Sequence, residues 1–198
     1  MKKRRKKIII IISLVILSLI FLLIVLNLVL RKSFNPESYE NDLSKLFGEG
    51  FLNDYSIKIY EKGIFQTFSS LTICNSIYLK KPSLLDETDL SLLLVHESTH
   101  VYQAKKVGCI RNSFSSLFHQ FKAFLSTGSR GNAYFYLLKQ PDNYNPEQEA
   151  TIIEDYYYLK FLEGNESYIY CLDCQYYEKG ELVNSLEEKY LKIIEKYN

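Results

Sequence analysis

Two histidines and a glutamate stand at a spacing that suits metal-assisted hydrolysis. Residues 96 to 100 read His-Glu-Ser-Thr-His, an HExxH motif. On a helix, His96 and His100 project from one face about one turn apart, so both imidazoles can reach one Zn²⁺ ion. Glu97 then points at the same region without being a ligand, where its carboxylate can take a proton from an attacking water. The motif predicts metal ligands at His96 and His100 and a general base at Glu97.

The surroundings of the motif favour a buried helix. An apolar run at 90–95 precedes it, and the chain holds only three histidines, two of which flank Glu97. The alternative is an ordinary amphipathic helix whose histidines are simply polar. Because buried ionisable groups need partners and a metal ion supplies one, the sequence favours a metal site.

A second helix is expected to supply the third metal ligand. An N-cap, a first-turn proline and a capping box begin at Asn145, so a helix is predicted from Pro146 to Glu163. Two histidines and one carboxylate leave a fourth position for water, which is the catalytic pattern. We predict Glu147 as the ligand, because it shares a helix face with the small Ala150. The alternatives are Glu149 and Glu154, or carboxylates that only complement the helix dipole.

Several other polar residues are weighed as possible additional members of the metal site. His119 is interpreted as a partly exposed helix residue, with a fourth ligand or a transition-state donor as the alternatives. Gln103 and Lys106 stand where a longer signature has a glycine and a third histidine, so the three-histidine class is excluded. One of the 17 tyrosines could stabilise an oxyanion, but the sequence does not say which.

The N-terminal segment differs from the rest of the chain. Residues 2–7 are all Lys or Arg, and an apolar run follows at 8–30. A helix of this length spans about 34 Å at about 1.5 Å per residue, which predicts one transmembrane helix. The alternative is a cleaved signal peptide. The basic residues place the N-terminus (1–7) in the cytoplasm and residues 33–198 outside, as an extracytoplasmic domain of a single-pass cell-membrane protein.

The charge balance limits the partners. Residues 1–32 hold eight Lys or Arg and no acid, which leaves 16 basic against 23 acidic side chains in the remainder. Nucleic acid is therefore not an expected partner, because phosphate binding needs a basic surface. The expected partners are the membrane, through the anchor, and a protein or peptide substrate. The remainder has the size of one domain with its own core.

The rest of the chain reads as a mixture of helices and strands. β-Branched and aromatic residues between 56 and 80 predict two or three strands. Helices are predicted at 38–47, 86–107, 111–126 and 181–197. Four cysteines stand at 74, 109, 171 and 174, and the CxxC spacing of the last two suits a redox pair, half of a zinc site or a local disulfide. We favour structural disulfides or plain thiols, with the pairing left open.

Both motifs resemble those of gluzincin-type, zincin-like metallopeptidases. HESTHVYQ at 96–103 and NPEQEA at 145–150 are similar to the HELTHVWQ-like and EQQA-like words of small bacterial peptidase-like domains, over roughly residues 70 to 160. The resemblance implies an α+β, zincin-like domain, with a small, mostly antiparallel sheet packed on the HExxH helix and further helices, behind one N-terminal transmembrane helix. It implies one Zn²⁺ held by His96, His100 and Glu147, with Glu97 as the base and a strand at 72–79 along the substrate groove.

One position departs from the family pattern. Many gluzincins carry an aspartate four residues after the ligand glutamate, where it orients a zinc-bound histidine; Thr151 stands there, and its hydroxyl is expected to do a weaker version of this. The expected function is a membrane-anchored, zinc-dependent metallopeptidase. The alternatives are a zinc-binding but inactive interaction module and a tethered binding protein without metal.

Overall fold

The computed structural model describes residues 12, 14–15, 18–19, 21–23, 25–27, 29–62, 70–141, 143–165 and 168–197. Its helices are α2 (Glu40–Phe47), α3 (Phe51–Asp54), α4 (Glu87–Val107), α5 (Cys109–Thr127), α6 (Pro146–Phe161) and α7 (Lys179–Tyr197). Its strands are β1 (Lys32–Ser33), β2 (Lys58–Lys62), β3 (Leu71–Ile73) and β4 (Ser76–Tyr78). Short 3-10 turns lie at Glu37–Tyr39, Pro82–Leu84, Arg130–Ala133 and Cys174–Tyr176.

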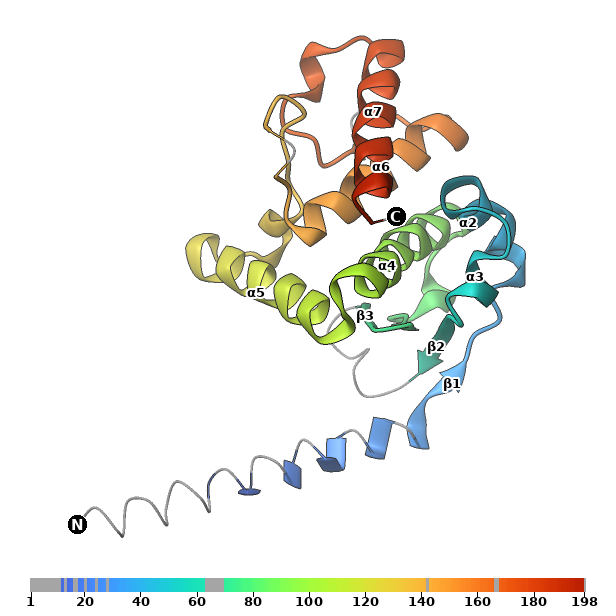
Figure 1. Ribbon diagram of the computed structural model, residues 1–198, viewed down its shortest axis with the longest axis vertical. Helices are drawn as coiled ribbons and strands as arrows, with labels where there is room; N and C mark the ends of the chain where they lie inside the picture. Colours follow the sequence, from blue (N-terminus) through green and yellow to red (C-terminus); the bar gives the residue numbers. More distant parts are fainter. Residues whose placement is uncertain are drawn as a thin grey trace, which may run out of the picture.

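Helix α4 is the centre of the molecule. The sheet lies on one side of it and α6 and α7 lie on the other (Figure 1). The helix begins at Asp86, whose side chain accepts a hydrogen bond from the backbone N–H of Asp89 at 2.8 Å. It ends at Gly108, whose φ of 92° suits glycine and turns the chain into α5. Leu94 faces the sheet-side core and Val95 the helical core, so α4 is buried nearly all round.

The sheet is small and mixed. Its strand order is β1-β2-β4-β3, with β2 and β4 parallel and the other two pairs antiparallel. Strand β3 reverses direction into β4 through a hairpin. Strand β4 therefore runs in the same direction as β2, beside which it lies. Strand β3 is therefore an edge strand, and it packs against α4. This contact brings Thr72 next to the HExxH motif.

The structure corrects the predicted fold. Helices, 3-10 turns included, make up 67% of the described residues, the sheet has only short strands, and the same residues contain no membrane-spanning helix. The predicted α+β, zincin-like domain with a mostly antiparallel sheet behind a transmembrane helix is therefore wrong as stated, and a zincin fold is not shown. Local sequence pattern placed the helices, but it did not determine how the strands pair.

The predicted membrane anchor is also corrected. No helix among the described residues is long and apolar enough to cross a membrane, so the transmembrane helix at 8–30 and the single-pass, extracytoplasmic location are wrong. The prediction rested on a run of apolar residues. Only part of that run is described, namely residues 12, 14–15, 18–19, 21–23, 25–27 and 29–30, all of them helical. The rest of that stretch, and the predicted basic N-terminus at 1–7, lie outside the described residues.

Two disulfides pair all four cysteines. Cys74 bonds to Cys109 and ties the β3–β4 turn to the start of α5. Cys171 bonds to Cys174 and closes a short loop, which is the local disulfide among the interpretations of the CxxC spacing. The first cross-link fixes the edge strand that carries Thr72 against the helices.

We expect the two disulfides to differ in their contribution to stability. Replacing Cys74 and Cys109 with serine removes a cross-link between residues 35 apart in sequence, which should lower the free energy of unfolding by about 4 kcal/mol in the chain-entropy treatment. Replacing Cys171 and Cys174, three residues apart, should cost only about 1.5 kcal/mol. Urea unfolding of both variants under non-reducing conditions measures the difference, and equal losses would contradict it.

Candidate metal centre

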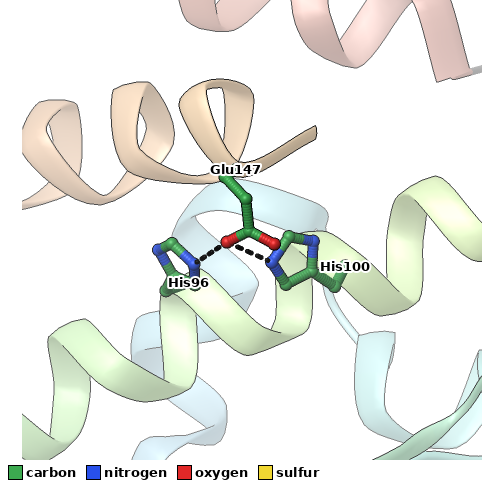
Figure 2. A group of neighbouring side chains, drawn as sticks. All are labelled: His96, His100 and Glu147. Carbon is green, nitrogen blue, oxygen red and sulfur yellow. Dashed lines mark ion pairs between the residues drawn. The ribbon is translucent and has the colours of Figure 1, made fainter. Parts of the chain in front are cut away.

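Three side chains meet between α4 and α6. Glu147 reaches from α6 to a point between His96 and His100 on α4 (Figure 2). Its Oε2 lies 3.5 Å from Nε2 of His96 and 3.5 Å from Nε2 of His100. The ligand atoms of these residues all lie within 4.8 Å of one another, so they could hold one ion. The structure thus brings together the three ligands expected from the sequence.

The burial of Glu147 suits a metal ligand. Its side chain is only 1% exposed, and its Oε2 has no hydrogen-bond partner in the structure. A buried carboxylate oxygen without a partner is costly, so this atom needs a cation or a donor beside it. Two imidazole nitrogens and one carboxylate oxygen are the donor set of catalytic zinc sites. The residues present therefore fit a Zn²⁺ ion.

The electrostatics of the group favour a positive charge at its centre. Burial alone would raise the pKa of Glu147, but His100 and His96 hold that pKa well below its usual value. Burial alone would lower the pKa of His96 and of His100, yet the interaction with Glu147 raises both. Glu147 and the histidines thus stabilise one another's charged forms, whereas His96 opposes a second proton on His100. A cation bound here would take the place of the proton between neutral imidazoles and the carboxylate.

Glu154 orients His96. Its Oε2 lies 2.8 Å from Nδ1 of His96, so it accepts the ring N–H and leaves Nε2 to face Glu147. Thr151, the expected residue for this task, instead donates to the backbone oxygen of its own helix at Glu147, at 2.9 Å. Glu154 is therefore an orienting partner in this structure. Its position seven residues after Glu147 places both on one face of α6.

Gln103 orients the second histidine. Its Oε1 lies 2.9 Å from Nδ1 of His100, and its Nε2 donates to Oε2 of Glu149 at 2.9 Å. Glu149 also accepts hydrogen bonds from Tyr197, at 2.6 Å, and from Lys196. Helix α7 thus contacts the site through Glu149, and Glu149 is not placed as a ligand. Sequence reasoning missed this role of Gln103, and the signal that could have revealed it is the spacing of three residues from His100.

The expected base faces an open cavity. Thr72 on β3 donates to Oε2 of Glu97 at 2.8 Å and so fixes the carboxylate. Burial raises the pKa of Glu97, while the neighbouring His100 and His96 lower it in part. Glu97 and His96 line a cavity of about 720 Å³. The carboxylate is therefore placed where a water and a substrate can both approach it.

Two further residues join the site from loops and neighbouring helices. The ring of Tyr134 lies 5.6 Å from that of His96, centroid to centroid, and lines the same cavity. Burial, with the charges of Glu147 and Glu97, raises the pKa of Tyr134, so its hydroxyl stays protonated. Gln120 on α5 donates to Oε1 of Glu147 at 3.1 Å. Sequence pattern gave no signal for either contact, because both depend on tertiary packing.

His119 is not part of the metal group, which consists of His96, His100 and Glu147 among the described residues. Its ring packs edge-on against Phe118, with the centroids 5.7 Å apart.

Comparisons with protein-family models, with curated proteins and with solved structures found no match to this chain. The function must therefore be argued from the site itself.

We expect Glu154 to control metal affinity. Replacing it with leucine removes the acceptor for Nδ1 of His96, which should weaken Zn²⁺ binding about 10–100-fold. Competition with a chromophoric chelator at neutral pH measures this change. The matched variant Glu154→Gln keeps an acceptor oxygen and should bind Zn²⁺ nearly as tightly as the wild type. Equal losses in both variants would show that the orienting hydrogen bond is not the cause.

Proposed function

We propose that this protein is a zinc-dependent hydrolase that cleaves peptide bonds. His96, His100 and Glu147 would hold one Zn²⁺, and Glu97 would act as the general base. The observation that carries the proposal is the buried Oε2 of Glu147, which has no hydrogen-bond partner and lies 3.5 Å from each imidazole. The HExxH motif adds a second carboxylate, that of Glu97, beside this point and at the wall of a cavity.

Glu97 is positioned to move a proton. A bound Zn²⁺ supplies a water of lowered pKa and polarises the carbonyl under attack. The hydrogen bond from Thr72 engages Oε2 of Glu97 and leaves Oε1 for the water. Glu97 takes the proton of the attacking water and passes it to the leaving nitrogen, which is the sequence of proton transfers that amide hydrolysis requires.

Tyr134 is positioned to stabilise the oxyanion. It lies beside His96 on the cavity wall, and its hydroxyl stays protonated because burial raises its pKa. A protonated hydroxyl at this point of the cavity wall can donate a hydrogen bond where negative charge develops on the substrate oxygen. Tyr134 thus supplies the donor that sequence alone left unassigned.

The cavity supports a peptide as the substrate. It has a volume of about 720 Å³, and its walls combine tyrosine rings with leucines and carboxylates. Such a mixture of apolar surface and a few polar groups is typical of substrate sites. The neighbouring β3 is an edge strand, so an extended peptide can pair with its backbone while its scissile bond reaches the metal centre.

Glu97→Gln tests the proposal directly. The variant keeps the shape of the side chain but cannot accept the proton, so it should retain one equivalent of Zn²⁺ and lose peptide hydrolysis by about 10²-fold or more. Metal analysis and cleavage of a mixed peptide library measure the two properties. Undiminished turnover would refute the role of Glu97. A wild-type protein that holds zinc and cleaves nothing would instead support an inactive interaction module.

Tyr134→Phe should separate transition-state stabilisation from substrate binding. Removing one oxyanion donor should lower kcat by about 10²–10³-fold, whereas KM and Zn²⁺ affinity should stay near the wild-type values. Steady-state kinetics with a cleaved peptide, together with a zinc titration, provide both readouts. A rise in KM at unchanged kcat would assign Tyr134 to substrate binding alone.

A further inference from the structure

Helix α5 has its polar and apolar faces reversed with respect to the domain. Two of its polar side chains point inward, where Asn112 donates to the backbone oxygen of His100 at 3.1 Å and Gln120 donates to Glu147. Its large apolar side chains point outward. These are Ile110 (73% exposed), Phe114 (68%), Leu117 (60%), Phe118 (61%), Phe121 (55%), Phe124 (48%) and Leu125 (68%). The structure describes every residue of α5, and Asn112 is the only buried one.

The spacing of this outward face, which we call the α5 face, is that of a helix-packing seam. Residues 110, 114, 117, 121 and 124 follow one another at alternate steps of four and three, and 118 and 125 lie along one flank. An apolar repeat averaging 3.5 residues is the pattern with which one helix packs against another. The α5 face therefore suits a helical partner.

The size of the α5 face matches one half of a protein interface. Its seven side chains together expose on the order of 700 Å², beyond the roughly 300–600 Å² of the largest apolar patch on a typical monomer. A standard interface buries about 800 Å² on each partner. Two α5 faces packed together would therefore provide nearly all of the contact that a stable dimer needs.

The off-centre position of Phe118 and Leu125 selects the orientation. Both lie on one flank of the α5 face, whereas Ser113 and Gln120 lie on the other. In a parallel pair opposite flanks meet, so Phe118 and Leu125 would face the polar flank of the second copy. In an antiparallel pair like flanks meet, so Phe118 would pack against its own counterpart. We propose that the α5 face is a dimer interface at which two copies of this chain pack their α5 helices antiparallel around Phe118.

A dimer formed through the α5 face would also stabilise the candidate metal centre. The dimer itself does not require the centre to be catalytically active. Gln120 and Asn112 lie on the opposite side of α5 and contact Glu147 and His100. A partner that holds α5 in place therefore also holds the hydrogen bonds to two of the three candidate ligands. The proposal stands on the exposed face, however, and can be tested even if the protein cleaves nothing.

Cysteine cross-linking tests the dimer and its orientation. All four native cysteines form disulfides, so an introduced cysteine is the one free thiol. Two differently tagged copies of the full chain are produced together, each carrying Phe118→Cys, and a short bismaleimide is added to the lysate. We expect a cross-linked product of twice 23.3 kDa that carries both tags. Phe124→Cys should give little product, because antiparallel helices place its two copies far apart.

A second test introduces a negative charge at the centre of the α5 face. Adding Leu117→Glu to the Phe118→Cys chain should reduce the cross-linked fraction about ten-fold or more, because it buries an unpaired carboxylate at the interface. The matched change Leu191→Glu, at an exposed leucine of α7 (56% exposed), should leave it unchanged. Absence of the Phe118→Cys product, equal products at 118 and 124, or insensitivity to Leu117→Glu would each overturn the proposal. Lipid vesicles that protect the thiol of the Phe118→Cys chain from labelling, without any cross-linking, would overturn it too and identify a lipid surface as the occupant.

Discussion

The burial of one carboxylate between two imidazoles is the constraint that organises this protein. Glu147 is almost fully enclosed, and one of its oxygens has no donor, so the surrounding structure must provide positive charge at that point. It does so by carrying both histidines on α4, a helix covered by the sheet on one side and by α6 and α7 on the other (Figure 1). A more exposed α4 would let water solvate the group and would weaken every interaction within it.

Orientation is imposed from a second layer of residues. Each histidine presents Nε2 to Glu147 because its Nδ1 is engaged, by Glu154 for His96 and by Gln103 for His100. Glu154 reaches His96 from α6, and Gln103 of α4 is held in turn by Glu149 of α6, so the relative position of α4 and α6 supports both orienting residues. The same packing that forms the core therefore also fixes the tautomers that a metal requires.

The sequence predicted the local features well and the tertiary ones poorly. The HExxH spacing pointed to His96 and His100, and Glu147 was preferred over Glu149 and Glu154. The structure brings the ligand atoms of these three residues within 4.8 Å of one another, and their metal remains a proposal. Helix boundaries followed from caps and periodicity. The parallel pairing of β2 with β4 and the position of Tyr134 beside His96 did not, because they depend on contacts between distant segments. The anchor prediction rested on apolar composition and is contradicted, because no helix among the described residues is long and apolar enough to cross a membrane.

The link from α7 to the site has a consequence for biosynthesis. Lys196 and Tyr197 hold Glu149, which bonds Gln103 and through it His100, so residues about a hundred positions apart cooperate in one hydrogen-bonded network. While the ribosome is still making α7, His100 lacks this support, and the nascent chain carries an incompletely ordered centre. The site proposed for peptide hydrolysis, if assembled in this order, would remain dormant during translation and would mature only once the helical core had closed.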